Sequence, residues 1–259
     1  MCTVSFIARK DGYLLGMNRD EKLRRPAGVP PQRHHVRDRK VIYPSEPGGG
    51  TWISLNDGGS TLALINWYSA PHQTIADPIS RGEIIRTACD ATAPHEVVAT
   101  LASMLLARTR PFRLIGIFPA SHEVIEWRWN GLKLEGVKHL WRPNIWISSG
   151  YDEPGADQTR SKAFGAALLK VDRGTVEWLR SLHRSHSHGE SAYSICMHRD
   201  DAATVSYTEI EVSDSVRRMH YSANNPCTGK RSFLMRSCRS SYPKLLSGAA
   251  EATKGSSWD

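Results

Sequence analysis

Long apolar runs and regularly spaced cysteines are both missing from this sequence of 259 residues. Its longer apolar stretches, such as residues 62–65 and 103–107, fall far below the roughly 20 residues that a helix needs to span a bilayer. The first residues carry no basic segment followed by a long apolar one, so a cleaved secretion signal is not expected. We therefore expect no transmembrane segment and a cytoplasmic location.

The five cysteines are too few and too unevenly spaced for a disulfide framework, and their odd number leaves one unpaired. This usage fits a reducing compartment. The composition, with 40% hydrophobic and 23% charged residues, is that of a globular protein and shows no internal repeat. We expect one domain over residues 1–238 and a weakly ordered tail over 239–259, which is rich in Ser, Gly, Ala and Lys.

The formal net charge of +8 is concentrated at the two ends of the chain. Residues 1–40 hold ten basic and four acidic side chains, and residues 213–259 hold eight and three. Such an excess can attract nucleic acid, an acidic membrane surface or an anionic ligand. No nucleic-acid-binding motif accompanies the charge, so we expect a solvated surface and no specific nucleic-acid partner.

Hydrophobic periodicity predicts blocks of hairpin-linked strands that are interrupted by pairs of helices. Asp11-Gly12 and residues 56–59 are hairpin signals, and the proline-rich stretch 24–47 is expected to run over the surface. Strands are expected over residues 4–8, 13–18, 51–55, 61–67, 112–118, 124–129, 141–148, 192–197, 204–210 and 216–223, and helices from Asp77-Pro78, from Pro94, over 161–169 and over 175–183. This order predicts the α+β class, with antiparallel sheets and helices packed outside them.

Cys2 is the residue with the clearest chemical potential. A small second residue permits methionine aminopeptidase to remove Met1, which leaves a cysteine with a free α-amine. The thiol titrates near ~8.5 and the amine near ~7.7–8.0, so the amine can take the thiol proton close to neutral pH. Cys2 would then supply both nucleophile and base. A buried small residue is the alternative interpretation.

The run Asn18-Arg19-Asp20-Glu21 ends the second strand of the first expected hairpin, which returns the chain to the neighbourhood of Cys2. Because side chains alternate along a strand, Asn18 and Asp20 share one face and Arg19 points to the other. Asp20 is the expected partner of the Cys2 amine, and Asn18 a donor to substrate. Local salt bridges at a charged strand end are the alternative.

Over residues 1–70 the sequence resembles the NRDE family, also known as transport and Golgi organisation 2-like. The motifs that carry the resemblance are Met1-Cys2, Asn18-Arg19-Asp20-Glu21, Arg25-Pro26, Gly49-Gly50-Thr51-Trp52 and Ala63-Leu64-Ile65-Asn66. The resemblance implies the fold of the N-terminal-nucleophile (Ntn) hydrolases, a four-layer αββα sandwich of two antiparallel sheets.

A more distant similarity is to choloylglycine hydrolases and penicillin acylases, Ntn enzymes that also begin Met-Cys-Thr and cleave amides. Carried over to this sequence, it implies that Cys2 is the nucleophile, that Asp20 lies near the terminal amine, and that Asn66 helps to form the oxyanion hole. Trp52, Trp67 and Arg19 are further candidates to bind substrate, with core packing as the alternative for both tryptophans.

Two departures from those enzymes bear on the substrate. Met17 stands where they carry an arginine, so that Arg19 takes a different place, and Ser148-Ser149 stands where a second oxyanion asparagine is expected. Ser148 is a candidate donor to substrate, but the loss of a well-placed oxyanion donor can cost ~2.7–4 kcal/mol. Bile-salt-like substrates are therefore not expected.

No metal site is predicted from the spacing of histidines and cysteines. The members of the histidine-rich run, His183, His186, His188 and Glu190, are expected in a solvated loop, and Cys196, Cys227 and Cys238 have no C-x-x-C relation.

Together these features predict an N-terminal-cysteine hydrolase that acts without a cofactor on an amide or acyl bond of a small molecule. The alternative, taken from the namesake of the family, is a non-catalytic protein that binds or carries a hydrophobic ligand such as haem or a lipid.

Overall fold

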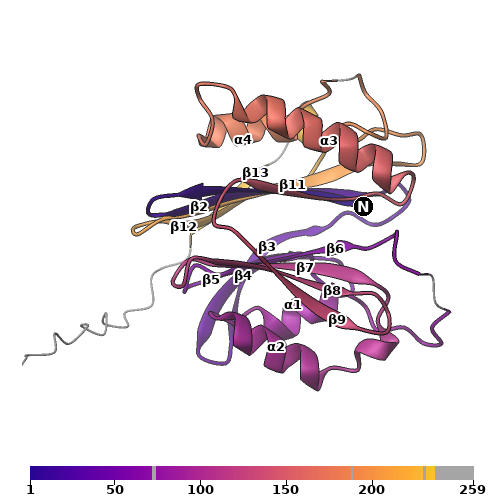
Figure 1. Ribbon diagram of the computed structural model, residues 1–259, viewed down its shortest axis with the longest axis vertical. Coiled ribbons are helices and arrows are strands. Elements are labelled where there is room, and N and C mark those ends of the chain that lie inside the picture. Colours follow the sequence, from indigo (N-terminus) through magenta and orange to yellow (C-terminus); the bar gives the residue numbers. More distant parts are fainter. Residues whose placement is uncertain (72–73, 188, 230–231, 237–259) are drawn as a thin grey trace, which may run out of the picture.

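Two antiparallel sheets stack face to face, and a pair of helices covers the outer side of each, as the computed structural model shows (Figure 1). The structure describes residues 1–71, 74–187, 189–229 and 232–236. The helices are α1 (Gly82–Ala88), α2 (Pro94–Ser103), α3 (Glu153–Leu168) and α4 (Val176–His183), with single 3₁₀ turns at η1 (Leu106–Arg108) and η2 (Pro226–Thr228). The expected α+β sandwich is confirmed.

The first sheet, covered by α3 and α4, has six strands within the described residues. In spatial order they are β10 (Asn144–Ser148), β1 (Cys2–Arg9), β2 (Gly12–Lys22), β11 (Ala202–Val212), β12 (Arg217–Ser222) and β13 (Ser232–Arg236). The second sheet, covered by α1 and α2, has seven in the same described part of the chain. They are β3 (Val29–Val36), β4 (Arg39–Ser45), β5 (Ile53–Asn56), β6 (Thr61–Asn66), β7 (Phe112–Phe118), β8 (Glu123–Trp129) and β9 (Leu134–His139).

Alternation along β1 and β2 divides their side chains between two hydrophobic cores. Cys2, Val4 and Phe6 point into the core between the sheets, where they meet apolar residues such as Ile53 of the second sheet. Ile7 instead enters the core beneath α3 and α4. Cys2, the first residue of β1, therefore faces the second sheet.

The face of the first sheet beneath the helices also holds buried polar groups. Ser5 Oγ lies 2.7 Å from Nε2 of His183 on α4, and the Asn18 amide donates to the backbone oxygens of His183 and Ile195. His183 is fully buried, so its expected place in a solvated loop is wrong. The hydrogen bond between the buried His183 imidazole and Ser5 of β1 therefore links α4 to the first sheet.

The proline-rich stretch 24–47 is not a surface excursion but contains the β3–β4 hairpin. Pro30 and Pro31 are tolerated because β3 is an edge strand and the pairing shifts register between Val29 and Gln32. The strands β9 and β13 were not foreseen.

Two other expectations fail for local reasons. The first helix begins at Gly82 rather than at Asp77, because Ile79 donates its N–H to Arg108 and forms a bridge with Thr109. Residues 192–197 form turns instead of a strand, since Ser194 and Cys196 donate to nearby loop carbonyls. The hairpins at Asp11-Gly12 and 56–59 are confirmed.

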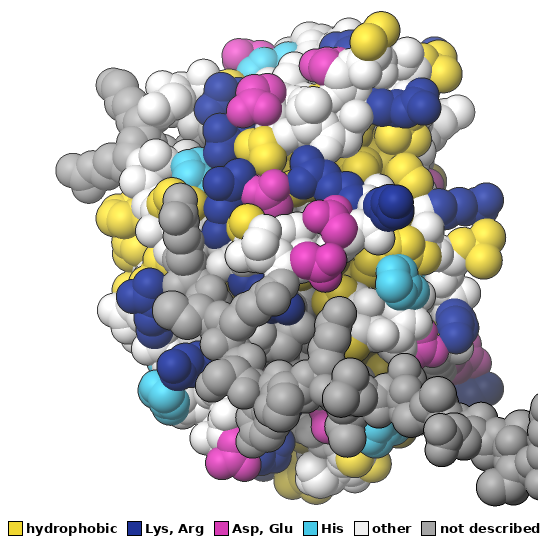
Figure 2. Space-filling model, turned by 90° about the vertical axis from the view of Figure 1, so that its left-hand side faces the viewer, with side chains coloured by type: hydrophobic (Ala, Val, Ile, Leu, Met, Phe, Trp, Pro, Cys, Tyr) yellow, Lys and Arg dark blue, Asp and Glu magenta, His cyan; other side chains and the backbone are white. Residues whose placement is uncertain are grey.

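The expected single domain over 1–238 stays a prediction, and the tail over 239–259 lies outside the described residues. Within the described residues, no helix is both long and apolar enough to cross a bilayer. The face drawn in Figure 2 carries both basic and acidic side chains among its described atoms.

Gly12 and Gly165 provide a matched pair of substitutions for the fold. Gly12 has a φ of +154°, and an added Cβ would lie 2.0 Å from the Val212 carbonyl oxygen, whereas a Cβ at Gly165 in α3 meets nothing within 4 Å. We expect Gly12→Ala to lower the free energy of unfolding by about 1–3 kcal/mol. Gly165→Ala should raise it by about 0.5–1 kcal/mol, and urea denaturation measures both. Equal effects would contradict the described β2–β11 approach.

His183 makes stability depend on pH. Burial lowers its pKa from 6.5 to about 3, so between these values the unfolded chain binds a proton that the folded chain does not. Stability should therefore fall as the pH drops below 6.5, and His183 alone should account for about 2–3 kcal/mol between pH 7 and 4.5. Urea denaturation at both pH values should show a smaller fall for His183→Gln, but an unchanged fall for the exposed control His35→Gln. An equal fall in all three proteins would show that His183 is not buried in its neutral form.

Candidate functional site

A cavity of about 300 Å³ opens at the start of β1, between the ends of the two sheets. We call it the N-terminal cavity. Its floor includes Cys2 and the end of β2, and its walls come from the segment after β4 and from the segment that leads into α1. Its charged or polar lining residues are Arg19, Asp20, Glu21, Arg25, Glu46, Thr51, Asn66, Ser80, Arg81 and Arg110.

Met1 is held against the end of β2 by its backbone. Its ammonium donates to the Asp20 carbonyl oxygen at 3.0 Å, and the Asp20 N–H donates to the Met1 carbonyl at 3.0 Å. Burial lowers the pKa of this ammonium, but the effect is outweighed by the negative charges that Cys2, Tyr68, Asp20 and Glu21 can carry, so the pKa is raised. The site thus favours a positive charge beside Cys2.

Cys2 lies between Arg19 on β2 and Ser148 on β10, its two direct partners in the sheet. The residue is 8% exposed and lines the cavity. Burial raises the pKa of the Cys2 thiol, and the terminal ammonium and Arg19 partly offset this by favouring the thiolate. Each positive charge near the sulfur therefore makes it more reactive.

Arg19 is fixed by contacts on two sides. Its guanidinium donates to Glu46 at 2.7 Å and lies 4.4 Å from the ring centre of Trp52. Glu21 lies 3.7 Å from Arg19 and also accepts from Arg25 at 2.7 Å. Arg19 and Trp52, both expected at the site, thus lie together in the cavity wall.

The carboxylate of Asp20 turns away from the amine. One oxygen lies 3.1 Å from the Arg160 guanidinium of α3, and the other accepts from the Thr204 hydroxyl at 2.7 Å. The Asp20 carbonyl, not the expected carboxylate, accepts from the terminal ammonium in the chain that retains Met1. Asn18 lies on the same outer face and does not line the N-terminal cavity, and the expectation that it binds substrate stays a prediction.

The other predicted site residues are placed unequally. Asn66 lines the cavity, where its amide donates to the Tyr68 hydroxyl at 2.7 Å. Ser148 is buried opposite Cys2, and its hydroxyl has no hydrogen-bond partner within the described residues. Trp67 does not line the cavity and donates instead to Ser69, because the strand ends at Asn66 and the chain turns away.

Sequence reasoning missed three charged residues of the cavity, Glu46, Arg81 and Arg110. Burial lowers the pKa of Arg81 and the neighbouring Arg110 adds to this, while Tyr68 opposes it. Arg81 donates to the Pro111 carbonyl at 3.1 Å, and within the described residues neither arginine has an ion pair with a carboxylate. Arg81 and Arg110 reach the cavity only because they lie beside α1 and β7, so no local sequence motif identifies them.

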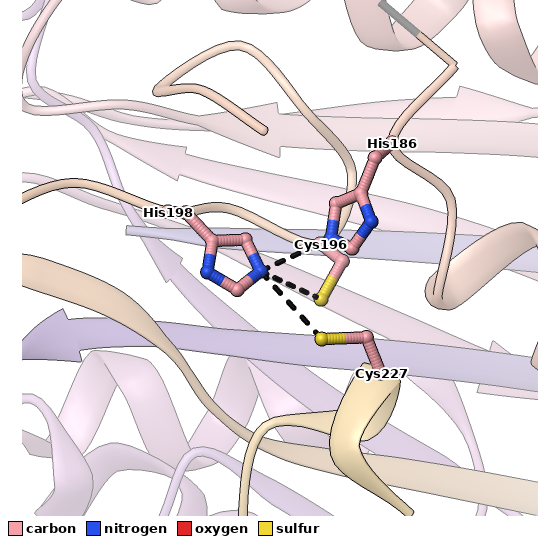
Figure 3. Close-up of side chains that lie close together, drawn as sticks. All are labelled: His186, Cys196, His198 and Cys227. Atoms are coloured by element: carbon pink, nitrogen blue, oxygen red, sulfur yellow. Dashed lines mark hydrogen bonds between the residues drawn. The ribbon is translucent and has the colours of Figure 1, made fainter. Parts of the chain in front are cut away.

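A second cluster also escaped the sequence analysis. His186, Cys196, His198 and Cys227 converge on one another, although no metal-binding pattern was expected from their spacing (Figure 3). His188 and Cys238 lie outside the described residues.

Comparison with known proteins relates the chain to one sequence family and to one group of folds. A family model described as Transport and Golgi organisation 2 matches residues 1–153. No curated protein matches significantly. The fold is similar to that of penicillin V acylase from Agrobacterium tumefaciens, at 10% identity and a TM-score of 0.52 over 91% of this chain and 86% of that one. It is also similar to a mutant conjugated bile acid hydrolase from Clostridium perfringens, at 11% identity and a TM-score of 0.51 over 91% and 92%. The expected Ntn-hydrolase fold is confirmed.

The reactivity of Cys2 tests the described arrangement of charges. Arg19→Gln removes a cation that favours the thiolate, so the pKa of Cys2 should rise and the midpoint of its alkylation should move to higher pH. Iodoacetamide labelling followed by peptide mass spectrometry measures this midpoint. Arg110→Gln, in the same cavity but not paired with Cys2 across a strand, should leave it unchanged. A midpoint that stays in place in Arg19→Gln would contradict the pairing.

Proposed function

Since this chain belongs to the Transport and Golgi organisation 2 family, we propose that it hydrolyses an amide or acyl bond of a small molecule, with the Cys2 thiol as nucleophile. The observation that carries the proposal is the position of Cys2 at the floor of the N-terminal cavity, beside an α-amine and opposite Arg19. By their names, the two solved structures of similar fold are an acylase and a hydrolase of conjugated bile acids.

The reaction requires that the peptide bond ahead of Cys2 be cleaved, which in this sequence releases Met1. The freed Cys2 amine then takes the thiol proton, and the thiolate adds to the substrate carbonyl carbon. The tetrahedral intermediate breaks the C–N or C–O bond, and the ammonium returns the proton to the leaving group. Water then attacks the thioester and releases the acid, which regenerates the thiol.

Residues around the cavity have defined tasks in this scheme. The Asp20 carbonyl, which accepts from the terminal ammonium of Met1, is the group proposed to orient the amine of the shortened chain. The Asn66 amide, which lines the cavity, is the donor proposed for the oxyanion, and the Ser148 hydroxyl, which lies opposite Cys2 and has no hydrogen-bond partner within the described residues, is a second candidate. Arg19 stabilises the thiolate.

The charges of the cavity favour an anionic substrate. Arg81 and Arg110 lie close enough for one to lower the pKa of the other, and no carboxylate among the described residues pairs with them. A carboxylate or phosphate on the substrate would relieve that repulsion. The same lining is less suited to an uncharged lipid, so hydrolysis is favoured over the alternative of a lipid carrier. Haem binding stays the second candidate function only because the carboxylates of haem can pair with Arg81 and Arg110.

The test uses the full chain with a free N-terminus. Intact mass should show that Met1 is absent, and a panel of small amides and esters, each with and without a carboxylate, should identify a substrate. Cys2→Ala should lower kcat/KM by at least about a thousandfold because the nucleophile is lost. Cys89→Ala removes a buried thiol outside the cavity and should leave the rate unchanged.

Two results would defeat the hydrolase proposal. One is turnover by Cys2→Ala at the wild-type rate, and the other is a chain in which Met1 is retained in all molecules. A haem titration in which Cys2→Ala and wild type bind equally, with no turnover of the panel, would favour the carrier instead.

A further inference from the structure

Four side chains from three separate segments converge on one another (Figure 3), and none of them lines the N-terminal cavity. His186 follows α4, Cys196 and His198 belong to the turns ahead of β11, and Cys227 lies in η2 after β12. One nitrogen or sulfur atom from each lies within 4.8 Å of the other three. We call them the His/Cys cluster.

Hydrogen bonding alone does not account for this convergence. Nε2 of His198 lies 3.0 Å from Nε2 of His186, 3.7 Å from each of the two sulfur atoms and 3.3 Å from the amide nitrogen of Asn225. A ring nitrogen carries either one hydrogen or one lone pair, so it can satisfy only one of these four neighbours at a time. A cation among the ligand atoms would satisfy both imidazole nitrogens and both sulfur atoms together.

Three of the six separations between the ligand atoms are close to those of tetrahedral coordination. Bond lengths of about 2.3 Å to sulfur and 2.0–2.1 Å to nitrogen imply edges of about 3.6 Å between nitrogen and sulfur and about 3.3 Å between two nitrogens. The measured values are 3.7 Å for both edges from His198 to sulfur and 3.0 Å for the edge between the two imidazoles. The other three separations are no longer than 4.8 Å, so side-chain movements of up to about 1 Å would complete the tetrahedron.

We propose that His186, Cys196, His198 and Cys227 form a four-coordinate Zn²⁺ site. Two thiolates and two imidazoles in tetrahedral array are a donor set for zinc, and the two thiolates neutralise the charge of the ion. Because the protein supplies all four ligands, the site is structural rather than catalytic. Asn225 lies beside the site: its side-chain oxygen accepts from the protonated Cys196 thiol at 3.0 Å and from the Cys227 N–H at 3.1 Å, which keeps the two cysteines together before a metal binds.

The site would join η2 to the segment that supports β2. Met197, between two of the ligands, donates its N–H to the Thr204 hydroxyl, which in turn donates to the Asp20 carboxylate at 2.7 Å. The metal would therefore hold the layer directly behind the Met1–Asp20 contact. The cluster stands independently of the reaction proposed for Cys2.

Metal content of the full chain is the first test. The protein is purified in reductant by ion exchange, without a polyhistidine tag or a chelating resin, and dialysed before mass spectrometry of metals. About one zinc per chain is expected. Cobalt(II) added to the zinc-free protein should give the visible bands of tetrahedral Co²⁺ and a thiolate charge-transfer band in the near ultraviolet.

Variants of the ligands locate the metal. Cys227→Ser and His186→Asn should each weaken zinc binding, measured against a chromophoric chelator. Loss of a group that only supports a metal ligand lowers affinity about 10–100-fold, so loss of a ligand itself should lower it by at least that much. The matched controls Cys89→Ser and His95→Asn, which remove a cysteine and a histidine outside the cluster, should bind zinc as wild type does. Zinc should raise the thermal unfolding midpoint of wild type but not of Cys227→Ser.

Several results would overturn the proposal. Wild-type protein that folds but takes up neither zinc nor cobalt would contradict it, as would cobalt bound without a thiolate band. Zinc retained undiminished by both ligand variants, or iron bound in place of zinc, would also contradict it. A disulfide between Cys196 and Cys227 in protein purified with reductant, found by peptide mapping, would overturn it as well. The cobalt titration uses the wild-type protein, so it tests the proposed site even if a ligand variant does not fold.

Discussion

The antiparallel register of β1 against β2 determines which chemistry the N-terminal end of this protein can present. Cys2 pairs with Arg19, so both side chains point between the sheets, while Thr3 and Asn18 pair beneath the helices. A slip of one residue would exchange the two faces and bury the sulfur under α3. The fixed register follows from the apolar side chains of both strands, which fill two different cores.

Much of this arrangement is readable from the sequence, because it depends on neighbours along a hairpin. The alternation of Asn18, Arg19 and Asp20 is observed as predicted, and the order of strands and helices led to the correct fold class. Which face carries the site was not readable: Asn18 was assigned to substrate, whereas the cavity lies on the side of Arg19. That choice depends on the position of the second sheet, which no local pattern specifies.

Residues brought together from distant segments were beyond sequence reasoning for the same reason. Glu46 follows β4 and reaches Arg19 from a β3–β4 hairpin in the stretch 24–47, which was expected to run over the surface. The His/Cys cluster draws on segments separated by turns and by two strands, so its spacing matches no short motif. A search for closely spaced cysteines cannot detect ligands that lie in separate loops and meet only when the chain folds.

The edges of the wider sheet have a consequence for association between copies of the chain. Its edge strand β3 carries Pro30 and Pro31, which lack the N–H groups that an approaching strand would need. At the opposite edge, β9 carries the charged residues Glu135 and Lys138. Both edges thus disfavour hydrogen bonding to a strand of another copy of the chain. Within the described residues, the seven-stranded sheet is in this way protected from edge-to-edge aggregation.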